Sequence, residues 1–124
     1  MRTRIAFFLT VFLLATLAIA SDEPYLFPIE ADGLWGYIDA TGKIALKQAY
    51  QSAAHFAEGA APVKIGTTFG YINRSGTVII QPQFDEARFF YKALAPVRKG
   101  STWGYIDHTG KFLISPKFEV ARSF

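Results

Sequence analysis

The sequence predicts an all-β protein: an array of about three units of 34 residues with three short antiparallel strands each, preceded by a signal peptide. Three observations predict it. The stretch WGYIDATG at residues 35–42 returns as FGYINRSG at 69–76 and as WGYIDHTG at 103–110, without a gap. Short apolar runs alternate with turn residues between these stretches, as in strands joined by turns. The first twenty residues form a separate apolar block. A fixed period of this length is typical of stacked repeats, in which neighbouring units cover each other.

Residues 1–20 have the layout of a secretory signal peptide. Arg2 and Arg4 precede an apolar run that only two threonines interrupt, and Ala18-Ile19-Ala20 supplies a small-x-small cleavage site. An uncleaved membrane anchor is the alternative, but the run is shorter than the roughly 20 residues that a span needs. We therefore expect cleavage after Ala20, a periplasmic or secreted product without a stable membrane span, and a loose lead-in at residues 21–25.

The composition argues against several classes of function. The chain has 13 Lys and Arg against 10 Asp and Glu, and loss of Arg2 and Arg4 would leave 11 against 10, a net charge of +1. No cluster of basic residues remains that would predict nucleic-acid binding. Cysteine is absent, which excludes disulfides, thiol chemistry and cysteine metal sites. Stability must therefore come from packing.

The predicted repeat domain covers residues 26–124. We expect its units to start near Trp35, Phe69 and Trp103, with the last unit truncated. In units one and two, 11 of the 34 positions are identical, whereas ordinary residue frequencies would give about two or three. The repetition is therefore a true duplication.

Three strands are expected in each unit: a Pro-Val segment, the signature segment and an apolar run. Their expected ranges are 26–30, 35–39 and 43–47; 60–65, 69–73 and 77–81; and 94–98, 103–107 and 111–115. Proline has no N–H, so the Pro-Val strand should lie at an edge or carry proline among its first residues. The third strand is apolar on both faces, which predicts cover from both sides. A second proline should end it, and the segment that follows has room for one helical turn.

The link between the second and third strands predicts the same tight turn in every unit. Asp or Asn stands first, where its side chain accepts backbone hydrogen bonds, and Gly stands fourth, where φ is positive. In the second strand, alternation puts Trp35 and Tyr37 on one face and Gly36 on the other, where it leaves room for a neighbouring backbone or ring. The signature residues that we interpret as structural are Trp35, Gly36, Tyr37, Gly42, Phe69, Gly70, Tyr71, Gly76, Trp103, Gly104, Tyr105 and Gly110.

Aromatic residues also recur after the third strand. They occupy two sets of equivalent positions: Tyr50, Phe84 and Phe118, and Phe56, Phe90 and Phe124. Since equivalent positions in stacked units lie over one another, we expect aromatic ladders in the core. Three units are fewer than the roughly four to eight blades of a propeller, which favours an open array over a closed one.

Together these features resemble the WG-containing repeat family of bacterial proteins. The pattern is Trp-Gly-Tyr-Ile-Asp-x-x-Gly, an apolar strand, x-Pro-x-Phe and Ala-x-x-Phe, and it covers residues 26–124. The departures are Phe69 in place of Trp, and Gln48-Ala49 where unit one lacks its proline. The resemblance implies a β-rich repeat scaffold without established catalytic residues, often exported or at the cell surface, with presumed binding roles. It carries over no functional residues.

The carboxylates offer little for chemistry. Asp39 and Asp107 lie in turns that supply one carboxylate each, and Asn73 replaces it in the middle unit, so turn capping is favoured over calcium binding. Glu58 and the adjacent pair Asp85-Glu86 do not form the two facing carboxylates that a glycosidase needs. We expect no metal site and no cofactor.

Histidines and large aromatics are the remaining candidates. His55 and His108 lie in a loop and a turn, without a nucleophile or acid at a recognisable spacing, so we expect both to be exposed and no catalytic residue in the chain. Trp35, Phe69 and Trp103 could form an aromatic row that stacks on sugars or cations. Every unit needs an aromatic at this place whatever the ligand, which favours packing between units.

The function expected from these arguments is binding. We expect an exported, non-catalytic protein that binds a partner protein or an envelope or extracellular polymer. The alternative is a structural N-terminal fragment of a larger surface protein, with no binding activity of its own; the oligomeric state stays open. Since the signature has structural reasons, function should be sought where the units differ, for example at Ala40, Arg74 and His108.

Overall fold

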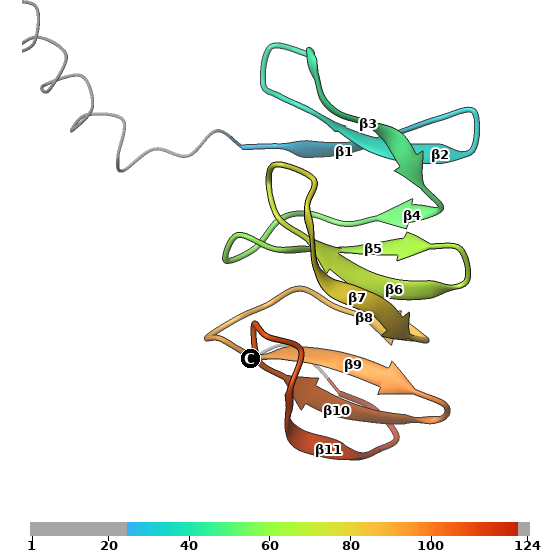
Figure 1. The fold of residues 1–124 in the computed structure, drawn as a ribbon, viewed down its shortest axis with the longest axis vertical. Helices are drawn as coiled ribbons and strands as arrows, with labels where there is room; N and C mark the ends of the chain where they lie inside the picture. The colour runs from blue at the N-terminus through green and yellow to red at the C-terminus, as the bar shows by residue number, and fades with distance from the viewer. Residues whose placement is uncertain (1–24, 122–124) are drawn as a thin grey trace, which may run out of the picture.

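The structure is a computed structural model that describes residues 25–121 of the 124-residue chain. Eleven strands in this range form three antiparallel sheets, which stack along the long axis of the molecule (Figure 1). The all-β repeat fold is thus confirmed. The strands are β1 (Phe27–Ala31), β2 (Leu34–Ile38) and β3 (Ile44–Tyr50) in sheet 1; β4 (Ser52–Ala53), β5 (Ala61–Ile65), β6 (Thr68–Ile72) and β7 (Val78–Phe84) in sheet 2; and β8 (Glu86–Ala87), β9 (Ala95–Lys99), β10 (Thr102–Ile106) and β11 (Phe112–Phe118) in sheet 3.

Residues 25–121 contain no helix with the length and apolar character of a membrane span.

Each sheet is a meander whose strands pair in chain order. Sheets 2 and 3 start with a two-residue strand, β4 or β8, that one residue separates from the last strand of the sheet before. The prediction of a helical turn in the segment after the third strand is therefore wrong. The segment is extended because its backbone pairs with the Pro-Val strand of the same sheet. Ala54 N donates to Pro62 O at 3.2 Å, and Arg88 N donates to Pro96 O at 3.0 Å.

Prolines behave differently at their two positions. Pro62 and Pro96 are the second residues of β5 and β9, which matches the expectation for a residue without an N–H. Pro82 does not end its strand, contrary to our expectation, because β7 runs through it to Phe84. The strand bulges there: Tyr71 pairs with Ile80 and Phe69 with Phe84, so the proline lies between the two paired positions and no ladder bond needs its N–H.

The signature glycine faces this bulge. A Cβ on Gly70 would lie 2.5 Å from the carbonyl oxygen of Ile80 and 2.7 Å from the nitrogen of Pro82. Gly36 and Gly104 meet the backbone of β3 and β11 in the same way, with nearest distances of 2.6 Å. The room that the missing side chain leaves is therefore filled by the backbone of the next strand, as the sequence suggested.

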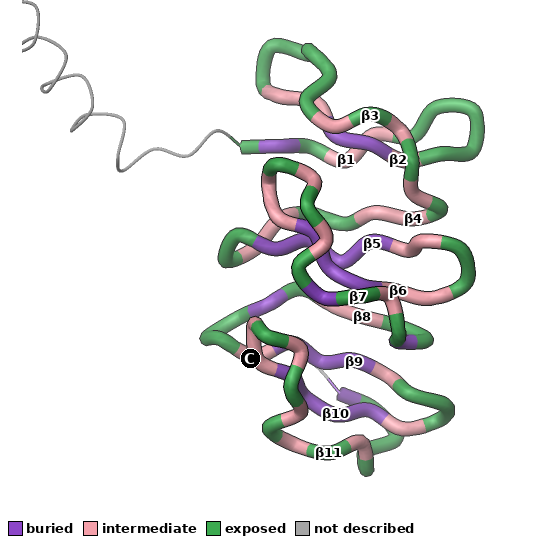
Figure 2. The backbone as a smooth tube through the Cα atoms, viewed as in Figure 1, coloured by how far each residue is buried: buried purple, intermediate pink, exposed green. Residues whose placement is uncertain are grey.

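Buried residues are most frequent in β5, β6, β9 and β10 (Figure 2), and their side chains form three clusters. The first cluster joins sheet 1 to sheet 2 and is centred on Tyr37, Val63 and Ile72. The second joins sheet 2 to sheet 3 and contains Tyr71, Phe84, Phe90, Val97 and Ile106, among others. A third, smaller cluster with Trp103, Tyr105 and Ala121 lies on the far face of sheet 3. The sheets are thus the layers, and the core is divided into slabs between them.

The third strand of each unit is not covered on both sides, so that expectation is wrong. Ile79 is 38% exposed, while its neighbours Val78 and Ile80 pack into the first and second clusters. The reason is a second bulge: Ile72 pairs with Val78 and Tyr71 with Ile80, which leaves Ile79 as an extra residue directed outwards. Side chains of one strand therefore pack into two separate clusters.

Aromatic rings pair in a different pattern from the expected ladders. The ring of Tyr37 lies 4.9 Å from that of Phe56, and the ring of Tyr71 lies 5.0 Å from that of Phe90. These contacts join the signature tyrosine of one unit to the phenylalanine that follows the next short strand. The pairs cross from one sheet to the next, because the chain itself crosses between sheets at β4 and β8.

Candidate functional site

The signature tyrosines hold neighbouring sheets together. The hydroxyl of Tyr37 donates to Ala54 O, and that of Tyr71 donates to Arg88 O, both at 2.6 Å. Both acceptors follow the short first strand of the next sheet. Burial raises the pKa of Tyr37 and of Tyr71 far above the usual value, so both hydroxyls remain neutral donors. These tyrosines therefore have a structural role in the stack.

The signature turns bind their own backbone. Asp39 Oδ1 accepts hydrogen bonds from the backbone N and the hydroxyl of Thr41, at 2.9 and 2.6 Å, and from Lys43 N at 3.1 Å. The hydroxyl bond lowers the pKa of Asp39, and the equivalent bond lowers that of Asp107. Asn73 Oδ1 accepts the same three bonds in the middle unit, so the geometry needs no charge.

The glycine that ends each turn has a positive φ: 87° at Gly42, 86° at Gly76 and 88° at Gly110. Residues 25–121 hold no group of three or more side chains that could bind a metal ion together. Turn capping is therefore the role that the contacts support for these aspartates.

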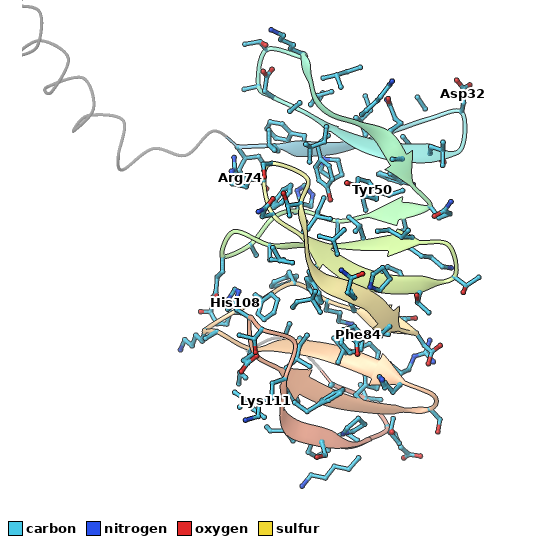
Figure 3. The ribbon with its side chains drawn as sticks, in the orientation of Figure 1. Asp32, Tyr50, Arg74, Phe84, His108 and Lys111 are labelled. Atoms are coloured by element: carbon cyan, nitrogen blue, oxygen red, sulfur yellow. The ribbon has the colours of Figure 1, made fainter. Side chains whose placement is uncertain are left out.

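The carboxylates considered for glycosidase chemistry also have structural contacts. Asp85 Oδ2 accepts from the backbone N of Gly100 at 2.7 Å and so caps the turn between β9 and β10. Gln51 caps the equivalent turn of sheet 2 through Gly66 N at 2.8 Å. The neighbouring Glu86 lies 3.6 Å from Arg98. This capped edge, marked by Asp32 in Figure 3, lies opposite the edge that carries Arg74 and His108.

The aromatic signature position does not form an exposed row. Trp103 is only 6% exposed, and Trp35 and Phe69 are half-buried. The guanidinium of Arg88 covers Trp103 at 4.4 Å from the ring centroid, and its Nη1 donates to Ala121 O at 2.6 Å. These contacts favour packing over a sugar-stacking face at this position.

Positions that differ between units cover the core phenylalanines. His108 stacks on Phe90 with ring centroids 3.9 Å apart, and its Nε2 lies 3.0 Å from Glu58 Oε1. Arg74, at the equivalent position, lies 5.5 Å from the ring centroid of Phe56. His108 is therefore half-buried, contrary to our expectation that both histidines are exposed, whereas His55 is exposed.

Two tight hairpins were not predicted from the sequence. One connects β4 to β5 through Glu58 and Gly59, with φ of 52° and 79°, and the other connects β8 to β9 through Lys92 and Ala93, with φ of 50° and 67°. Two consecutive positive φ values are the mark of a type I′ turn. Ala93 N also donates to Glu58 Oε1 at 3.0 Å, which ties the second hairpin to the first.

Exposed aromatic rings accompany these hairpins, and we call them the hairpin edge: Tyr25, Phe27, His55, Phe89 and Tyr91. Phe89 is 47% and Tyr91 41% exposed, on either side of a fully buried Phe90. At the other hairpin, the hydroxyl of Tyr25 lies 3.1 Å from His55 Nδ1, and its ring lies 4.7 Å from that of Phe27. Tyr25, expected in a loose lead-in, thus contacts the repeat domain. The run Phe89-Phe90-Tyr91 was the available signal for this surface.

The fold and the contacts define a class: a β-repeat protein in which each antiparallel sheet covers the next and a tyrosine joins each pair. The family model for the WG containing repeat matches three consecutive segments, residues 35–66, 69–103 and 103–124. The chain belongs to this family. No curated protein and no solved structure matches the chain.

Proposed function

We propose that the chain is an exported, non-catalytic binding module that recognises a partner protein or a cell-envelope polymer through the hairpin edge. The observation that carries the proposal is the exposure of Phe89 and Tyr91, at 47% and 41%. The signature aromatics, by contrast, are used in packing between sheets. Aromatic side chains of this kind supply large, rigid contact area for protein partners and flat faces for sugars.

Differences between the units support this choice of surface. Phe89 and Tyr91 correspond, one period earlier, to His55 and Ala57. A side chain needed only for stacking would be alike in both units, as the signature tyrosine is. Lys92 Nζ lies 5.6 Å from the centroid of the Tyr91 ring and adds a positive charge beside it. The surface thus presents exposed rings and a cation beside one of them.

The test uses two probes and one matched control. Purified bacterial sacculi represent the polymer, and an envelope protein extract coupled to beads represents the protein partners. Wild-type protein should be retained on one of them, and the double variant Phe89→Ser/Tyr91→Ser should lose at least about tenfold in affinity, or about 1.4 kcal/mol. Ile79→Ser removes a similarly exposed apolar side chain on β7 and should bind like wild type.

Retention of wild type and of all variants alike would contradict the role of the hairpin edge. No retention of wild type on either probe would contradict binding and favour the purely structural alternative. Thermal melts of each variant establish that a loss of retention is not a loss of fold.

Export is tested separately. We expect the chain expressed in a bacterial host to reach the periplasm or the medium, with cleavage after Ala20 by the route that residues 1–20 indicate. The intact mass of the purified product should then correspond to a chain that begins at Ser21. A cytoplasmic product that retains Met1 or Arg2 would contradict export without bearing on the binding surface.

A further inference from the structure

Sheet 1 differs from the other sheets in its first strand. In sheet 2, β5 pairs with β4 on one side and with β6 on the other. In sheet 3, β9 lies between β8 and β10 in the same way. Within residues 25–121, β1 pairs with β2 alone. Among the residues that the structure describes, one edge of β1 thus lacks the short strand that the repeat provides in sheets 2 and 3.

The segment after β11 corresponds to that short strand. Counting by the 34-residue period, Val120 and Ala121 are equivalent to β8 (Glu86–Ala87), and Glu119 is equivalent to the turn-capping Asp85. Ala121 is 4% exposed in the third cluster, and its carbonyl accepts from Arg88. The segment is therefore already held at the position from which β4 and β8 join the following sheet.

The two end faces match in the same way. On sheet 1, Ile29, Ile38 and Ile44 are equivalent to Val63, Ile72 and Val78, which pack into the first cluster. Ile44 is 56% exposed in sheet 1. On sheet 3, Phe118 is 39% exposed, whereas its equivalent Phe84 is fully buried between sheets 2 and 3.

We propose that copies of this chain associate head to tail, with the face of sheet 3 and residues 119–121 of one copy docked on sheet 1 and the free edge of β1 of the next. The argument is continuity with the interfaces inside the molecule. Val120 and Ala121 take the register of β8, opposite Glu30 and Ile29. The partners in such a contact present unlike surfaces, so the assembly grows beyond a dimer.

One substitution tests the register of the added strand. Glu30 stands where the equivalent strands have Lys64 and Arg98. Arg98 of β9 forms a salt bridge with Glu86 of the neighbouring strand β8. In the docked copy, Glu30 would lie opposite Val120 and close to Glu119. Glu30→Lys removes this like-charge approach and should tighten association by about threefold at low salt. An unchanged or weaker association of this variant would overturn the register.

The experiment is analytical ultracentrifugation of the full chain, as its expression host yields it, from about 1 to about 100 µM. We expect the mean mass to rise with concentration past that of a dimer. Ile44→Asp blocks the sheet 1 face and should be monomeric. Leu113→Asp is the matched control: Leu113 is 58% exposed, but its equivalent Ile79 stays outside the core when a sheet follows. This variant should associate like wild type.

Mixing two blocked variants decides the polarity of the contact. Phe118→Asp blocks the sheet 3 face and should also be monomeric alone. A mixture of Ile44→Asp and Phe118→Asp retains one intact face of each kind and should form dimers that grow no further. A monomeric wild type throughout the range, equal effects of Ile44→Asp and Leu113→Asp, or a mixture that remains monomeric would each overturn the proposal.

Discussion

The two interfaces between sheets are built from equivalent residues but differ in how completely those residues are buried. Each contains one tyrosine hydrogen bond of 2.6 Å to the next sheet. Three equivalent apolar positions are half-buried between sheets 1 and 2 and fully or almost fully buried between sheets 2 and 3: Leu46 and Ile80, Tyr50 and Phe84, and Phe56 and Phe90. The signature therefore defines the interface, and other residues decide how well it closes.

Two features account for the difference. The sheet that precedes the second interface, sheet 2, has four strands, whereas the sheet that precedes the first, sheet 1, has three. His108 also closes the second interface by stacking on Phe90 at 3.9 Å and meeting Glu58, while Arg74 lies 5.5 Å over Phe56 in the first. The comparison teaches that equal signatures do not give equal burial, because the surrounding residues are not repeated.

The largest expected effect comes from equivalent aromatic residues in the two interfaces. Phe84→Ala should lower the free energy of unfolding by about 4 kcal/mol, because it opens a cavity in a fully buried site. Tyr50→Ala, at a half-buried site, should cost about 2 kcal/mol. Urea unfolding measures both. Equal losses would show that the two interfaces are equally tight in solution.

The signature glycine should be next in size. Gly70→Ala places a Cβ 2.5 Å from a backbone oxygen and should cost about 3 kcal/mol, since neither strand can move away without breaking the bulge. Gly66→Ala is the control, because its φ is +70° but no atom lies within 4 Å of the added Cβ. It should cost about 1 kcal/mol from backbone strain alone. Similar costs for both would contradict a steric requirement at Gly70.

The tyrosine hydrogen bonds should be alike in the two interfaces. Tyr37→Phe and Tyr71→Phe each remove one donor to a backbone carbonyl at 2.6 Å and should each cost about 1 kcal/mol. Thermal unfolding of the two variants gives the comparison. A clearly larger loss at Tyr71 would mean that tighter burial strengthens the bond itself as well as the packing.

The hairpins offer a pair of opposite substitutions. Ala93→Gly should stabilise the protein by roughly 0.5–1 kcal/mol, since φ there is 67°, a conformation that costs an alanine energy. Gly59→Ala, at the equivalent position with φ of 79°, should destabilise by a similar amount. Chemical denaturation of the two variants, with Ala57→Gly as a control at negative φ, checks the sign of each change.

The smallest effect is the pH dependence of the Glu58 contact. The hydrogen bond from His108 holds the pKa of Glu58 below its usual value of 4.5. A carboxyl whose pKa is lowered by folding stabilises the native state above the unfolded pKa, and this contribution is lost as the pH falls through the folded value. Glu58→Gln should therefore cost a few tenths of a kcal/mol at pH 7 and nothing at about pH 2. A constant difference across this range would contradict the assignment.

Much of the fold follows from local chemistry. The Asp-x-x-Gly turns and the backbone contact of Gly70 could be predicted because each depends on one residue type with a specific steric or hydrogen-bonding property. The strand β8 could not, since two residues carry no periodicity and become a strand only by pairing with β9, whose position depends on the whole stack. The Lys92-Ala93 turn lacks the glycine that would have identified it.

The candidate site was harder to predict than the fold. His108 was expected to be exposed because its turn is, but its ring covers Phe90, which lies 18 residues away in the sequence. The exposed Phe89 and Tyr91 stand beside that buried ring, and only the direction of Phe90 shows which side faces water. Such directions depend on the neighbouring sheet and cannot be derived from the segment alone.

The one-residue bends at Gln51 and Asp85 have a consequence for how such a chain can change its length. The last strand of one sheet is followed after one residue by the first strand of the next, and sheets 2 and 3 begin 34 residues apart, at Ser52 and Glu86. Duplication of any 34 consecutive residues within the array would therefore restore every strand pair and every cap, wherever the copied segment began. Recombination in such a gene needs no defined boundary, and proteins of this design can gain or lose whole layers while each remaining layer keeps its contacts.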